Sequence, residues 1–141
     1  MWSTPRHTTR GTAWTPWPPS SEAALSNAIF EHEWSGSARA RLLFLVLDAP
    51  PHDTPQNRMT LRQSIEEAAS LGVRVIPVGA SGIDKRTEFL LRDLDIATGG
   101  TYTFLTDHSG IGGEHLEPSV GEYQVELFND LLVRLIVEAM S

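Results

Sequence analysis

The side chains best suited to chemistry follow apolar runs, at points where the chain leaves a predicted sheet. Asp48 comes directly after the apolar run 42–47, Ser81 lies in a Gly-Ala-Ser-Gly loop, and Asp107 follows a third apolar run. Carboxylate and hydroxyl oxygens are the ligands that a hard cation such as Mg²⁺ takes in proteins. The same residue types are also common in turns, so they predict a site only if the fold brings these loops together.

The loop after Asp48 carries two further candidates, His52 and Asp53, and two prolines that end the strand and fix the loop. His52, Asp48 and Ser81 have the residue types of a base, an acid and a nucleophile, so a hydrolytic α/β enzyme is one alternative. No Gly-x-Ser-x-Gly elbow accompanies them. The 80–82 segment is therefore better interpreted as a loop.

An aspartate at the end of a buried strand is also typical of phosphoacceptor receiver domains, which makes Asp48 the basis of a second alternative. Such a domain needs an acidic pair after an earlier strand and a lysine at the end of a later strand. The only lysine, Lys85, lies beyond the 79–82 loop, and no acidic pair follows an earlier strand. We therefore favour a binding module and expect no catalysis.

Alternating strand and helix signals predict an α/β fold with a parallel sheet and flanking helices. The apolar runs 42–47, 73–78 and 101–105 predict strands, and 42–47 is expected to be buried on both faces because its apolar residues do not alternate with polar ones. Helices are predicted from Ser20 or Ser21 to Trp34, from a Thr60-Leu-Arg-Gln63 capping box to Gly72, from Asp84 to Gly99, and from about Glu122 to Met140. Right-handed crossovers then bring the candidate loops to one edge of a Rossmann-like sheet of about three strands with four helices.

Composition and charge exclude several classes of function. The chain of 141 residues is long enough for one domain, which we place at 20–141 after an irregular, proline-rich leader at 1–19. A net charge of -7 with a single lysine argues against a nucleic-acid partner, and the lack of cysteine excludes disulfides and thiolate chemistry. Because no signal peptide or membrane-length apolar run is present, we expect a soluble, cytoplasmic protein.

Several motifs, in order, resemble the last three strands of a von Willebrand factor type A (VWA) domain. They are Leu-Val-Leu-Asp48-Ala-Pro-Pro-His52, Arg74-Val-Ile-Pro-Val-Gly79-Ala-Ser-Gly-Ile-Asp84, Ala97-Thr-Gly-Gly-Thr-Tyr102 and Phe104-Leu-Thr-Asp107, with a closing helix at Leu127-Phe-Asn-Asp-Leu-Leu-Val-Arg-Leu-Ile136. The chain is most similar to a largely bacterial subtype with Asp-Ala-Pro-Pro-His in this loop. The resemblance covers roughly residues 20–140 and implies a module that binds a protein partner through Mg²⁺ or Mn²⁺ at a metal-ion-dependent adhesion site.

The resemblance also shows what is missing. That family supplies most metal ligands from an Asp-x-Ser-x-Ser motif after a first buried strand, and this chain has no such motif. Ser20 or Ser21 stands where the family usually has a ligand threonine before a helix, and Asp48 matches its third element. The implied metal ligands are thus Asp48, Ser20 and Ser21, an incomplete set. Partner contacts are expected from His52, Asp53, Ser81 and Asp107.

We therefore interpret the chain as the C-terminal half of such a domain, without its first strands. In that family the missing first strand neighbours the strand that ends at Asp48, so its absence would leave the 42–47 strand with a bare apolar edge. An unpaired apolar edge recruits another strand. We accordingly expect a homodimer, a complementing chain or aggregation through residues 42–47.

Overall fold

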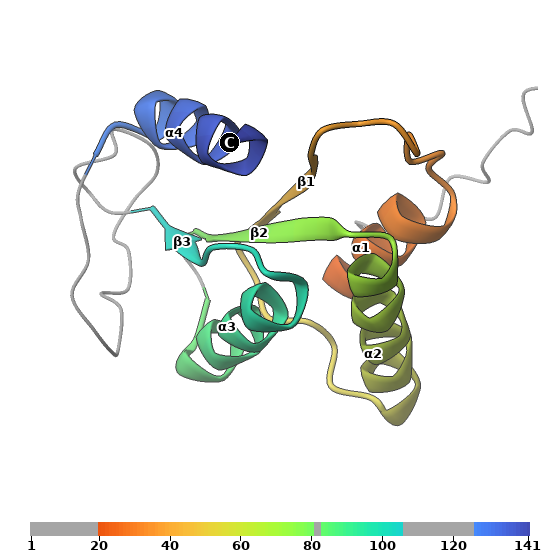
Figure 1. Cartoon of the computed structure of the whole chain (residues 1–141). Coiled ribbons are helices and arrows are strands. Elements are labelled where there is room, and N and C mark those ends of the chain that lie inside the picture. The colour runs from red at the N-terminus through yellow and green to blue at the C-terminus, as the bar shows by residue number, and fades with distance from the viewer. Residues whose placement is uncertain (1–19, 81–82, 106–125) are drawn as a thin grey trace, which may run out of the picture.

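A computed structural model describes residues 20–80, 83–105 and 126–141 (Figure 1). The elements in chain order are α1 (Ser21–Phe30), β1 (Arg41–Leu47), α2 (Pro55–Ser70), β2 (Val73–Gly79), α3 (Lys85–Thr98), β3 (Thr103–Phe104) and α4 (Phe128–Met140). The predicted α/β fold with a parallel sheet is confirmed. The leader at 1–19 and the start predicted for the last helix, near Glu122, lie outside the described residues.

The sheet has the order β1-β2-β3 and both strand pairs are parallel. In the register of β1 and β2, Arg41 lies opposite Val73 and Leu47 opposite Gly79. Alternate residues of these strands pack with α1, α2 and α3 in one core, whose buried members are Leu25, Ile29, Leu45, Leu47, Ala68, Val73, Val75, Ile83, Leu91 and Leu94. Figure 1 shows α2 and α3 on one side of the sheet and α4 on the other. The carboxyl ends of the strands therefore lie at one edge of a sheet that has α2 and α3 packed on the same side (Figure 1).

The prediction that β1 is buried on both faces is wrong. Leu45 and Leu47 are 8% and 9% exposed, but Val46, between them, is 56% exposed. Within the described part of the chain, β1 is the strand at one edge of the sheet. Helix α4 covers only the beginning of the second face of β1. There Leu135 of α4 and Leu42 of β1 line the same small space between helix and sheet. The apolar run thus forms an edge strand with one buried face.

Helix α2 begins six residues earlier than its Thr60 capping box predicts, at Pro55. Thr54 is the N-cap, and its hydroxyl accepts from the Asn57 amide at 3.1 Å. Pro55 is favourable in the first turn because it has no amide hydrogen that needs a partner there. Thr60 lies inside the helix, where its carbonyl accepts from the Ser64 hydroxyl.

The predicted ends of α3 are confirmed, because each end has its own local signal. The Asp84 carboxylate accepts from the Thr87 amide at 2.8 Å, and the helix stops at Gly99, which has φ of 67°. Gly100 then passes so close to β2 that a Cβ on it would lie 1.8 Å from the Val75 carbonyl oxygen. Only glycine fits this approach of the chain to the sheet.

Three other element boundaries differ from the sequence prediction. Helix α1 ends at Phe30 instead of Trp34, and Trp34 folds back so that its indole N–H donates to the Ala28 carbonyl at 3.2 Å. Strand β3 is only Thr103–Phe104. It is shorter than predicted because the Tyr102 amide donates to the Asp95 carboxylate, at 2.7 Å, instead of to β2. Helix α4 begins at Phe128, because Leu127 before it is extended, with φ of -66° and ψ of 143°.

Helix α4 has two apolar faces. Leu135 is buried against the sheet at 4% exposure. The next residue, Ile136, is 39% exposed and belongs to a second apolar stripe at helical spacing. That stripe consists of Val133, Ile136, Val137 and Met140.

No helix in the described ranges has the length and apolar character needed to cross a membrane.

Candidate functional site

The three residues of the implied metal set line one groove beside β1. Ser20 and Ser21 come from the start of α1, and Asp48 follows the last residue of β1. The groove has a volume of about 430 Å³. Its lining is completed by Ala24, Leu45, Val46, Leu47, Ala49, Pro50 and His52. The fold therefore brings together serines and an aspartate that lie about 27 residues apart in sequence, the set that the resemblance implies.

Among the described residues, this groove supplies few oxygen ligands for a Mg²⁺ or Mn²⁺ ion. Both hydroxyls are already engaged: Ser20 accepts from the Ala23 amide as the N-cap of α1, and Ser21 donates to the Glu22 carboxylate at 3.1 Å. Asp48 is the only carboxylate of the lining. Among the described residues, no three or more His, Cys, Asp or Glu side chains are grouped so that they could hold a metal ion. A hard cation takes about six oxygen ligands, several of which are water for Mg²⁺, so these residues would supply only part of a coordination shell.

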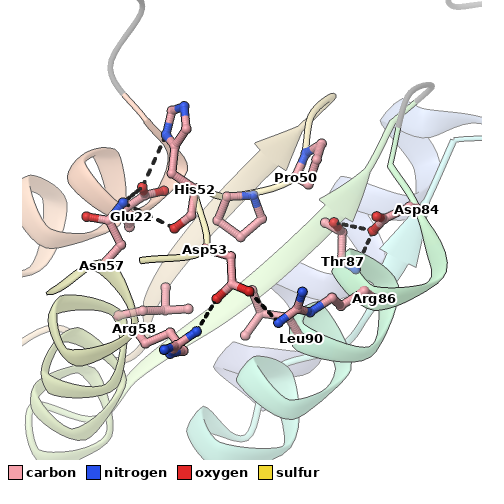
Figure 2. A pocket seen from close by; sticks show the side chains of 12 residues that line it. Glu22, Pro50, His52, Asp53, Asn57, Arg58, Asp84, Arg86, Thr87 and Leu90 are labelled. Atoms are coloured by element: carbon pink, nitrogen blue, oxygen red, sulfur yellow. Dashed lines mark hydrogen bonds and ion pairs between the residues drawn. The ribbon is translucent and has the colours of Figure 1, made fainter. Parts of the chain in front are cut away.

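A second pocket, of about 340 Å³, lies beyond the β1–α2 loop and reaches the starts of α2 and α3 (Figure 2). Its lining residues are Glu22, Pro50, Pro51, His52, Asp53, Asn57, Arg58, Leu61, Asp84, Arg86, Thr87 and Leu90. Pro50 and His52 line both the groove and this pocket. Figure 2 shows the charged side chains in three groups, around Glu22, Asp53 and Asp84.

Glu22 is the residue of this region that the sequence analysis missed. Its side chain is only 3% exposed, and its carboxylate accepts from the Asn57 side-chain amide at 2.6 Å and lies 3.4 Å from Nδ1 of His52. Burial alone would raise the pKa of Glu22, but hydrogen bonds from its own backbone amide and from the Ser21 and Ser20 hydroxyls, together with His52, lower that pKa overall. Glu22 is therefore a buried, ionised carboxylate at neutral pH.

Asp53, which is predicted as a partner contact, joins two helices within the chain. One carboxylate oxygen accepts from Arg86 of α3 at 2.6 Å, and the other accepts from Arg58 of α2. The hydrogen bond from Arg58 has the largest effect and holds the pKa of Asp53 below its usual value. The hydrogen bond from Arg86 acts in the same direction. The carboxylate is 42% exposed, so a partner can still reach it.

In the hydrolase alternative His52 would pair with Asp48, whereas in the structure it lies beside Glu22. The carboxylate next to its ring is that of Glu22 and, among the described residues, no hydrogen bond or ion pair joins it to Asp48. The imidazole is 74% exposed and lies between the groove and the second pocket. Ser81 and Asp107 lie outside the described residues. The partner contact of His52 therefore stays a prediction, and the His52 side chain is accessible to a partner.

Comparisons of the chain with models of protein families, with curated proteins and with solved structures each gave no match. The resemblance to VWA domains thus stays a prediction from the sequence motifs.

Proposed function

We propose that this chain is a protein-binding module, a VWA-like half-domain that takes up an extended segment of another chain along the outer edge of β1. The observation that supports the proposal is the outward-facing backbone of an edge strand whose residues Leu42 to Leu47 are all uncharged. Addition of a strand to such an edge is a common mode of protein recognition, because main-chain hydrogen bonds supply affinity and adjacent pockets supply specificity.

The direction of the β1 backbone follows from its pairing with β2. The Ala80 amide donates to the Leu47 carbonyl at 2.8 Å, so the polar backbone groups of Leu47 face β2. These groups alternate in direction along a strand, and those of Leu42, Phe44 and Val46 therefore face the outer edge. In the part of the chain that the structure describes, β1 pairs with β2 alone.

The side chains of β1 provide none of the usual protection of an edge strand. Natural edge strands are commonly blocked by charged residues, proline or a bulge. Residues Leu42 to Leu47 are all apolar, and Val46 is 56% exposed. The groove along Leu45, Val46 and Leu47 leaves room for the side chains of an added strand, and Asp48, Ser20 and Ser21 offer polar contacts at its end.

In this proposal the backbone and the groove carry recognition, and no bond is made or broken. A Mg²⁺ or Mn²⁺ ion would take part only if the added chain brought the oxygen ligands that the groove lacks. The expected partner contact of His52 fits the same edge, because His52 lines this groove, whereas Asp53 lines the second pocket.

Replacement of Val46 by proline tests this function. Its amide faces the outer edge, so Val46→Pro removes no hydrogen bond of the β1–β2 pair but blocks strand addition. Val46→Thr is the matched control, because it keeps the amide and suits a strand. The probe is a fluorescein-labelled peptide of alternating Thr and Val residues, followed by anisotropy.

We expect this peptide to bind the wild type and Val46→Thr, and to bind Val46→Pro roughly tenfold more weakly or worse. Circular dichroism of the two variants establishes that both are folded. Equal binding of the peptide by folded Val46→Pro and Val46→Thr would overturn the proposed function.

A further inference from the structure

We infer that the chain that fills this edge is a second copy of the same protein, paired through β1 in antiparallel orientation about a two-fold axis at Phe44. The inference rests on the proposed function and goes further by naming the partner and the register. It depends on three properties of β1: the direction of its backbone groups, the identity of its side chains and the charges at its two ends.

The backbone groups fix which residues can face each other. Leu42, Phe44 and Val46 direct their amides and carbonyls to the outer edge, since Leu47 directs its own to β2. In an antiparallel pair, two such residues exchange both hydrogen bonds. A two-fold axis at Phe44 places Phe44 opposite its own copy, and Leu42 opposite Val46 of the partner. This register uses every outward-facing residue between Leu42 and Val46.

The side chains agree with the same register. Leu45 and Leu47 belong to the core on one face of the sheet, so the alternate residues Leu42, Phe44 and Val46 point to the other face. Pairing about Phe44 places only apolar side chains opposite one another on that face. The exposed Val46 is then covered by Leu42 of the partner, and cross-strand apolar pairs of this kind stabilise a sheet.

The charges at the ends of β1 favour the antiparallel orientation over the parallel one. Arg41 begins the strand and Asp48 follows its last residue. Antiparallel pairing places the Arg41 end of one copy beside the Asp48 end of the other, whereas parallel pairing would place like charges side by side. A two-fold contact of this kind is also closed, so it gives a dimer and not a filament. The two sheets would become one continuous sheet.

Single-cysteine variants test both the partner and the register, because the chain has no cysteine of its own. In the inferred dimer, residue 44 meets its own copy at a separation that a disulfide can span. The two copies of residue 46 lie about 14 Å apart along the strands. Oxidation should therefore give a covalent dimer of Phe44→Cys, and none of the matched control Val46→Cys. If Phe44→Cys does not fold, an equimolar mixture of Leu42→Cys and Val46→Cys should give the mixed disulfide, and neither variant alone should.

Light scattering on the wild type separates this inference from the proposed function. We expect a dimer for the wild type and Val46→Thr, and a dissociation constant raised roughly tenfold or more by Val46→Pro. A wild type that is monomeric but still binds the Thr–Val peptide would overturn the second copy as partner and leave the proposed function standing. A dimer that is unchanged in Val46→Pro would overturn the inference too, since its interface would lie elsewhere, for example on the α4 stripe Val133, Ile136, Val137 and Met140.

Discussion

At the scale of single residues, Glu22 connects the parts of the candidate site. It lies in the first turn of α1, and the amide of Asn57 in α2 and the ring of His52 both contact its carboxylate. It also accepts from Ser21, which lines the groove beside β1. Because a buried carboxylate is stable only when it is well hydrogen-bonded, Glu22 fixes the position of α1 against the β1–α2 loop.

The replacement Glu22→Gln should destabilise the fold at neutral pH by about 1–3 kcal/mol, because it weakens hydrogen bonds to a charged group. The pKa of Glu22 is lower in the folded chain than the usual pKa of a glutamate. The stabilisation is therefore fully present above the unfolded pKa and is lost as the pH falls through the folded pKa. Urea unfolding at pH 7 and in acid measures this. The difference between wild type and Glu22→Gln should shrink in acid.

A control for this experiment is the exposed Glu33, whose change to Gln should alter the free energy of unfolding very little at either pH. A Glu22→Gln penalty that stayed the same in acid would show that the side chain acts through its shape and not through its charge.

The residues of the groove could be predicted from the sequence, and Glu22 could not. Asp48 follows an apolar segment, so the parallel topology places it at the carboxyl edge of the sheet, and the resemblance to a known family named the two serines. An acidic residue in the first turn of a helix is, by contrast, typical of a solvated helix start. What buries Glu22 is Asn57, which lies 35 residues further along the chain, and no local pattern reports such a contact.

At the scale of elements, α2 provides a direct test of which threonine begins the helix. The Thr54 hydroxyl accepts from the Asn57 amide, whereas Thr60 lies inside the helix. The change Thr54→Ala should therefore cost about 1 kcal/mol of stability, the usual contribution of an N-cap. Thr60→Ala should be close to neutral, since alanine has the higher helix propensity. Thermal unfolding of the two variants measures the difference, and a larger loss for Thr60→Ala would contradict the observed helix start.

Elements with strong local signals were predicted well, and those set by distant contacts were not. Asp84 and Gly99 bound α3 through their own side chain and backbone, so the sequence places both ends. The exposure of Val46 depends on what lies beside β1, which an apolar run does not report. The length of β3 depends on Asp95, whose carboxylate takes the Tyr102 amide away from the sheet.

At the scale of the whole molecule, the sheet order explains both the groove and the proposed partner. Within the described ranges β1 lies at one edge and β2 in the centre. In the proposed VWA-like half-domain, the first strand of that family would lie beside β1. The apolar edge that an added strand can cover and the lack of an Asp-x-Ser-x-Ser motif in the sequence would then have one origin.

This shared origin leads to a prediction for divalent cations. Titration of the wild type with Mg²⁺ or Mn²⁺, followed by calorimetry, should show no saturable binding below millimolar concentration. Among the described residues the groove offers one carboxylate, Asp48, whereas such ions take about six oxygen ligands. Asp48→Ala should give the same trace. A saturable heat that is lost in Asp48→Ala would contradict the incomplete donor set, and recognition through a metal ion would then replace recognition through the strand edge as the working function.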